Sequence, residues 1–163
     1  MKVKQKQANS RMCAICGMDN PFGVKAPFYV LEDNRVATLF RYREEHQSYP
    51  GRVHGGLITA MLDELGMRAY WALEPESLAV TISLETRYRK PVPYEVPLKG
   101  CGIILSSNSH FIKSQASIMD MDGNILAQAE MRYLKLPTQR ITDADYHEEM
   151  CYYIRDDVLE IEI

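Results

Sequence analysis

The most constraining feature of this sequence is one long apolar segment, residues 55–73, which predicts a buried helix. Its apolar side chains occupy positions all around a helical wheel, which is typical of a helix covered on every side. Pro75 marks the end of the segment, because proline does not continue a helix. A single helix must therefore lie at the centre of the core.

Strand patterns surround this helix on both sides in the sequence. The expected strands are residues 27–32 and 35–42 before the helix, then 78–92, 94–108, 109–123 and 124–136 after it. One helix with strands in this order predicts an α+β fold in which an antiparallel sheet wraps one face of the helix. The uncovered face or edges of such a sheet require a partner chain, so we expect a homo-oligomer.

The strand that follows the helix alternates between apolar and polar residues. Val80, Ile82 and Leu84 are predicted to share one face, and Thr81, Ser83 and Glu85 the opposite face.

Length and composition predict one folded domain with two extensions. The chain has 163 residues, of which 46% are hydrophobic, and this fits a single core. We expect a frayed N-terminus over residues 1–12, the folded domain over 13–140, and a C-terminal extension over 141–163. A short helix near 142–153 is the only structure expected in that extension.

Charge and hydropathy argue against several classes of function. With 19 basic and 22 acidic residues, the net charge is -3, which gives no basis for a nucleic-acid or membrane-surface binder. No apolar run reaches the roughly 18 residues of a membrane span. No signal segment opens the chain. We therefore expect a cytoplasmic protein with no nucleic-acid or membrane partner.

The four cysteines do not form the pattern of a secreted disulfide scaffold. Cys13 and Cys16 have the spacing of a zinc-binding pair, but a structural zinc site requires four ligands. Cys101 and Cys151 are isolated, and the histidines are scattered. The two interpretations are a zinc site and two thiols that pack a loop. We favour the second, and expect no metal and no cofactor.

His54, Gly55 and Gly56 stand at the start of the predicted helix. The first N–H groups of a helix have no internal partner, and the two glycines leave them open to an anion or a polarised carbonyl oxygen. The alternative is a tight turn that requires glycine. His54 is either a base that titrates near neutral pH or a helix cap.

Asp63 and Glu64 lie in the middle of the apolar segment, where an unpaired carboxylate is costly. Glu64 has Arg68 four residues later, a favourable spacing for an ion pair. Asp63 has no basic partner on this helix, so it is either paired from elsewhere in the fold or placed for chemistry. His54 and Asp63 are separated by roughly 13 Å along a helix. They serve one site only if two copies of the helix lie side by side.

The sequence resembles the HotDog-fold acyl-CoA thioesterases of the PaaI-like group. The resemblance lies in "GRVHGGLITAMLDE" and "TISLETRYRKPVP", with "CAICGMDNPFGV" as a leader, and it covers about residues 13–136. It implies a long helix wrapped by a curved antiparallel sheet, in dimers that often pair into tetramers. It also implies hydrolysis of a coenzyme A thioester without a cofactor.

The resemblance assigns roles to particular residues. Gly55 is the amide donor that polarises the thioester carbonyl, and Asp63 of the neighbouring subunit is the base or nucleophile. Thr81 is the assisting hydroxyl, unless it is an ordinary strand residue. His54 and Gly56 line the site.

One position departs from the family pattern. Several members carry an asparagine six residues before the histidine, where this chain has Ser48. Gln47 or His46 is a candidate replacement for that carbonyl donor. Two other functions stay open: an acyl-thioester hydratase or dehydratase, and a non-catalytic module that binds acyl-CoA.

Overall fold

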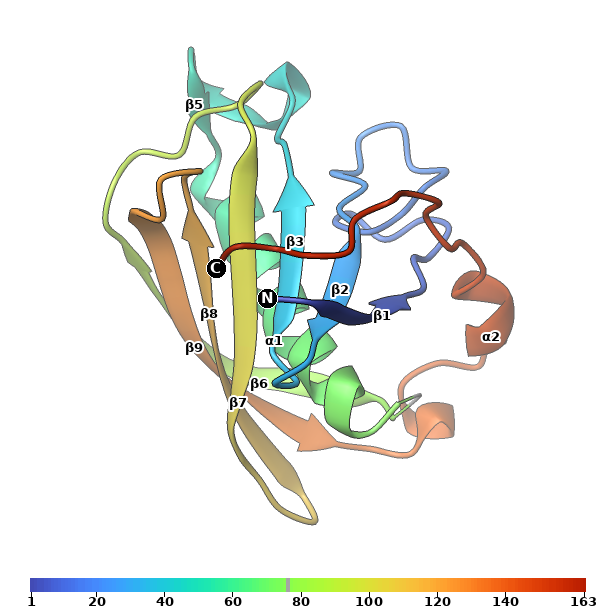
Figure 1. The fold of residues 1–163 in the computed structure, drawn as a ribbon. Coiled ribbons are helices and arrows are strands. Elements are labelled where there is room, and N and C mark those ends of the chain that lie inside the picture. Colours follow the sequence, from blue (N-terminus) through green and yellow to red (C-terminus); the bar gives the residue numbers. More distant parts are fainter. Residues whose placement is uncertain (76) are drawn as a thin grey trace.

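The computed structural model describes residues 1–75 and 77–163, and it places one long helix against one large sheet (Figure 1). Helix α1 spans Gly55–Leu73. Within the described residues the main sheet has seven strands. In sheet order they are β1 (Val3–Gln7), β2 (Phe28–Leu31), β3 (Val36–Phe40), β7 (Leu98–Ser107), β8 (Phe111–Met119), β9 (Ile125–Lys135) and β6 (Ala79–Tyr88). Neighbouring strands are antiparallel, so the predicted α+β architecture is confirmed.

Smaller elements complete the chain. A 3₁₀ turn at Glu44–His46 leads into a two-stranded ribbon of β4 (Gln47–Tyr49) and β5 (Arg52–Val53) immediately before α1. After β9 come a second 3₁₀ turn at Thr138–Arg140 and the one-turn helix α2 (Tyr146–Glu149). The ribbon therefore lies beside the start of the central helix.

Close contact between helix and sheet fixes the position of α1. A Cβ on Gly102 of β7 would lie 2.3 Å from the carbonyl oxygen of Leu65, and one on Gly66 would lie 2.5 Å from the Tyr133 hydroxyl. Glycine at both positions lets the helix backbone approach the sheet more closely than any side chain allows. Asp63 and Glu64, which directly precede Leu65 in the helix, are therefore held at a fixed distance from the sheet.

Strand β6 forms a free edge of the sheet, since it pairs only with β9 among the described strands. Its register shifts between Thr81 and Ser83, which marks a β-bulge. Thr81 contacts α1, and so do Thr86 and Tyr88 farther along the strand. The predicted simple alternation is therefore wrong, because a bulge changes which residues face the helix.

The N-terminal segment differs from the expectation of a frayed end. Val3–Gln7 forms strand β1 and pairs with β2. The C-terminal tail crosses the outer face of this part of the sheet, where Ile161 is buried in a small cluster with Tyr29, Leu31 and Ala37. The two chain ends thus contribute to folded structure, and the helix expected near 142–153 is a single turn.

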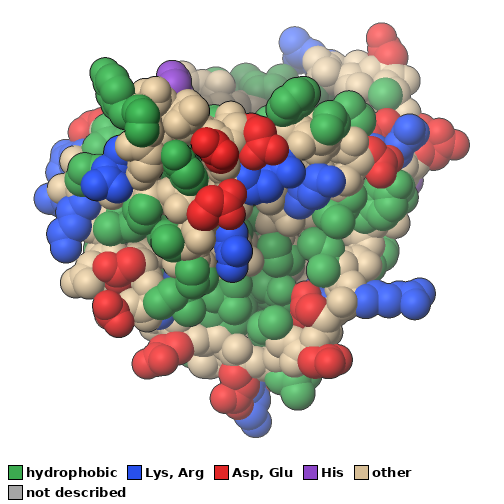
Figure 2. Space-filling model, turned by 90° about the horizontal axis from the view of Figure 1, so that it is seen from above, with side chains coloured by type: hydrophobic (Ala, Val, Ile, Leu, Met, Phe, Trp, Pro, Cys, Tyr) green, Lys and Arg blue, Asp and Glu red, His purple; other side chains and the backbone are tan. Residues whose placement is uncertain are grey.

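The surface mixes charges of both signs. Figure 2 shows lysine and arginine side chains interspersed with acidic ones around a group of hydrophobic side chains. Within the described residues, no helix is long and apolar enough to cross a membrane.

Candidate active site

The first turn of α1 is built around a histidine cap. His54 is the N-cap residue, and its Nδ1 accepts a hydrogen bond of 3.0 Å from the backbone N–H of Gly56. This contact satisfies one of the unpaired amides of the helix start. A ring nitrogen that accepts this bond is occupied, so His54 positions the turn.

The N–H group of Gly55 has no acceptor among the described residues. Its carbonyl is held at 2.9 Å by the Tyr88 hydroxyl, which lies 2.7 Å from Thr59 Oγ1. Tyr88 of β6 and Thr59 of α1 thus hold the backbone of the residue whose N–H group is free. Such an amide at a helix start is a ready donor for an oxygen that gains negative charge.

A hollow of about 460 Å³ opens beside this amide. Gly55 and Ser48 both contribute to its lining, and three basic side chains line it as well: Arg52, Arg89 and Lys90. The hollow therefore combines the free helix-start amide with positive charge.

Asp63 lies on the next part of the helix with a side chain that no cation neutralises within the described residues. Thr81 Oγ1 lies 3.0 and 3.1 Å from its two carboxylate oxygens, and Tyr133 donates to its backbone carbonyl at 2.9 Å. Burial raises the pKa of Asp63 above its ordinary value of 3.8, against the hydrogen bond from Thr81. The result is an oriented carboxyl group with increased affinity for a proton.

Glu64 points away from this group and has a structural partner. Its Oε1 accepts a bond of 2.8 Å from Arg68 Nε, and the arginine is fully buried. The ion pair predicted from the four-residue spacing is confirmed. The two adjacent acids therefore have different surroundings.

The structure brings some of the predicted residues together and separates others. Thr81 is hydrogen-bonded to Asp63, and Ser48 and Gly55 line the same hollow. Gln47 lies on the ribbon and contacts Tyr94 at 3.5 Å. Gly55 and Asp63 of one chain lie about 12 Å apart along the helix axis, since eight residues separate them. One chain alone does not place them around one small group.

His46 is unavailable as a carbonyl donor. It is buried, its Nδ1 accepts from the backbone N–H of Arg43, and its Nε2 lies 2.8 Å from the Phe22 carbonyl oxygen. Both ring nitrogens thus hold the turn before the ribbon. Ser48 and Gln47 are left as the candidates on this segment.

The sequence pattern did not predict the roles of two tyrosines at the site. Tyr88 and Tyr133 fix the backbone at Gly55 and Asp63 from strands β6 and β9. Their hydroxyls sit on otherwise ordinary strand patterns, so only the three-dimensional pairing shows which helical carbonyl each one reaches.

The architecture of α1 wrapped by this sheet recurs in solved thioesterases. A crystal structure of a thioesterase superfamily protein matches with a TM-score of 0.70 and 26% identity, over 76% of this chain and 63% of that chain. A hypothetical thioesterase from Streptococcus pneumoniae, solved with coenzyme A, matches with a TM-score of 0.62 and 16% identity, over 68% of this chain and 85% of that one. The molecule is a HotDog-fold protein.

The sequence also matches a family model and curated relatives. The model of the thioesterase superfamily matches residues 50–127, which include the helix start, Asp63 and Thr81. The rat acyl-coenzyme A thioesterase THEM4 is 36% identical over 69 residues, which is 42% of this chain and 28% of the rat protein. The chain thus aligns with little more than a quarter of that relative. The resemblance to the HotDog thioesterase superfamily is confirmed.

Proposed function

We propose that this protein hydrolyses an acyl-coenzyme A thioester to a free acid and coenzyme A. The proposal rests on the surroundings of the Asp63 carboxylate in an apolar helix. Thr81 orients this carboxylate, and no cation within the described residues neutralises it. A purely structural acid in this place would be expected to have a counter-ion, as Glu64 has in Arg68.

The chemistry requires an oxyanion donor and a base. The Gly55 amide stabilises the negative charge that develops on the thioester oxygen. Asp63 takes a proton from water as the water oxygen attacks the carbonyl carbon, or its own oxygen attacks directly and forms a mixed anhydride that water then hydrolyses to release the acid. The carbon–sulfur bond then breaks, and the sulfur leaves with coenzyme A and takes up a proton.

The two groups belong to different subunits in this proposal. Strand β6 is a free edge, and it carries exposed apolar side chains at Ile82 and Tyr88. Pairing of two β6 edges buries these side chains and brings the Asp63–Thr81 pair toward the neighbouring subunit. The site then combines Gly55 of one protomer with Asp63 of its partner.

The hollow beside Gly55 supports coenzyme A as the carrier of the acyl group. Arg52, Arg89 and Lys90 line it, and such cations suit the phosphate groups of coenzyme A. The fold neighbour from Streptococcus pneumoniae was solved with this molecule. Ser48 lines the same hollow and is our candidate for the second carbonyl donor.

A thiol-release assay with short, long and aryl acyl-CoAs tests the function. We expect free thiol from the wild type, and at least about a hundredfold lower turnover from Asp63→Asn, because the variant lacks a general base. The variant keeps an acceptor for Thr81 and should stay folded, which circular dichroism checks. Double-bond absorbance changes without thiol release would instead indicate a hydratase. Saturable binding with no turnover would indicate a binding module.

A further inference from the structure

The two cysteines of the leader loop lie beside a carboxylate of the central helix. Cys13 Sγ is 3.8 Å from Glu64 Oε2, and these atoms and Cys16 Sγ all lie within 4.8 Å of one another. A tetrahedral zinc ion with bonds of about 2.3 Å to sulfur needs donor atoms about 3.4 to 3.8 Å apart. The donor atoms of the cluster therefore lie within about 1 Å of that spacing.

The backbone of the loop holds the sulfur of Cys13 in place. The N–H groups of Ile15 and Cys16 point to Cys13 Sγ at 3.3 and 3.4 Å. Fully buried Asn9 fixes the loop, because its amide donates to the carbonyls of Cys16 and Ala26 at 2.8 and 2.9 Å. Hydrogen bonds from outside the ligand set orient metal ligands in this way.

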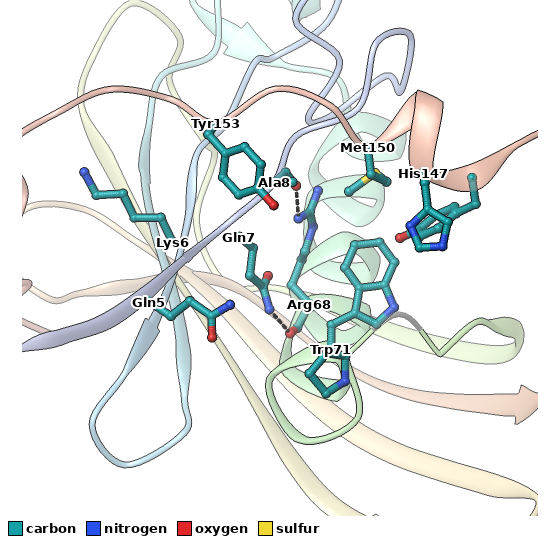
Figure 3. A pocket seen from close by; sticks show the side chains of 11 residues that line it. Gln5, Lys6, Gln7, Ala8, Arg68, Trp71, His147, Met150 and Tyr153 are labelled. Carbon is teal, nitrogen blue, oxygen red and sulfur yellow. Dashed lines mark hydrogen bonds between the residues drawn. The ribbon is translucent and has the colours of Figure 1, made fainter.

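Arg68 supplies a second, independent observation. Its guanidinium is fully buried and donates to the Ala8 carbonyl at 2.6 Å (Figure 3) and to Glu64. Its remaining nitrogen, Nη2, is buried without a partner among the described residues, and the guanidinium interacts with Cys16. A neutral thiol is a weak acceptor, whereas a thiolate at Cys16 is a charged acceptor for this unpaired donor.

We propose that Cys13, Cys16 and Glu64 bind one zinc ion as a structural site. Two thiolates and a carboxylate carry three negative charges, which the divalent ion and Arg68 balance. Ser10 offers a fourth oxygen, since its hydroxyl lies 3.4 Å from Cys16 Sγ. The ion would join the leader loop to α1 at the residue next to Asp63, so it would hold the helix that carries the candidate catalytic acid.

Cobalt titration of the reduced, chelator-treated full chain tests the site. We expect four free thiols before titration and a thiolate-to-cobalt charge-transfer band that saturates at one equivalent per chain. One equivalent of zinc should abolish the band. Cys13→Ser should weaken cobalt affinity at least about a hundredfold, because a direct ligand matters at least as much as the groups that orient it. Zinc should raise the melting temperature of the wild type and leave that of Cys13→Ser unchanged.

Matched variants separate this site from the rest of the chain. Cys101→Ser and Cys151→Ser should titrate as the wild type does, and so should Asp63→Asn, whose carboxylate is not in the cluster. Glu64→Gln keeps the shape of the side chain and should weaken binding while the sulfur band persists. A reduced wild type that shows no band overturns the proposal. A cobalt affinity that stays at the wild-type value in either Cys13→Ser or Glu64→Gln overturns it as well.

Discussion

Asp63 and Glu64 are neighbours in the chain, yet their side chains have different partners in the fold. Glu64 is joined to Arg68 and the cysteine loop, whereas Asp63 is oriented by Thr81 and held at its backbone by Tyr133. Since consecutive helical residues point about 100° apart, one faces the leader loop and the other faces the sheet edge. The difference in partners is the reason for assigning the chemistry to Asp63.

The raised pKa of Asp63 predicts linked changes in activity and stability with pH. The folded state binds the proton more tightly than the unfolded state, so Asp63 contributes stability below its ordinary pKa of 3.8, and this contribution is lost as pH rises through the folded value. Turnover should rise over the same window, because the base must be ionised. The free energy of unfolding, measured against pH for wild type and Asp63→Asn, checks this. Parallel curves for the two proteins would contradict it.

At the scale of single residues, the four-residue spacing on the helix predicted the Glu64–Arg68 pair, which forms. Thr81, which the family resemblance had singled out, lies against Asp63. The spacing did not predict Glu64 beside Cys13, since this contact joins two distant segments of the chain. A third ligand for the cysteine pair was therefore missing from the sequence interpretation.

At the scale of elements, the start of α1 provides the amide on which the proposed chemistry depends. Proline is tolerated at the first helical position and has no N–H group. His54 already has the extended backbone that precedes proline, with φ -64° and ψ 131°. A Cβ at Gly55 would meet its nearest atom, the Tyr88 hydroxyl oxygen, at 3.4 Å, which is an ordinary contact.

Gly55→Pro should therefore remove the donor without breaking the helix. We expect a fall in turnover of about a hundredfold to a thousandfold, the typical effect of losing one oxyanion donor. Gly55→Ala is the matched control, since it adds a Cβ and keeps the N–H, and it should stay close to the wild-type rate. Thiol release measures both. Equal losses in the two variants would show that space, and not the amide, is what matters at this position.

The bulge in strand β6 could not be predicted from the sequence pattern. Apolar and polar residues alternate through the strand, but the bulge between Thr81 and Ser83 interrupts the alternation of faces. A bulge depends on pairing with β9, which periodicity does not report. The helix, six of the seven strands described in the main sheet and the fold class were predicted correctly, because they follow from the one long apolar segment and the sequence of strand patterns. Strand β1 was not predicted, because its residues are mostly polar.

At the scale of the whole molecule, the free β6 edge is the surface through which we expect two copies to pair. Ile82 is 47% exposed at the bulge of this edge. Ile82→Asp should dissociate the assembly into inactive monomers, because pairing would bury an unpaired charge. Sedimentation velocity measures the outcome. Met121→Asp, at a similarly exposed residue in the β8–β9 turn, is the control and should assemble normally. An active monomer would contradict the shared site.

Subunit mixing tests whether Gly55 of one protomer works with Asp63 of the other. Neither Asp63→Asn nor Gly55→Pro alone retains an intact site. Co-folding the two variants in equal amounts creates mixed dimers in which one of the two sites has both native groups. We expect recovery to about a quarter of the wild-type rate, since about half of the dimers are mixed and each of these has one intact site of two. A rate no higher than the mean of the two parent variants would contradict it.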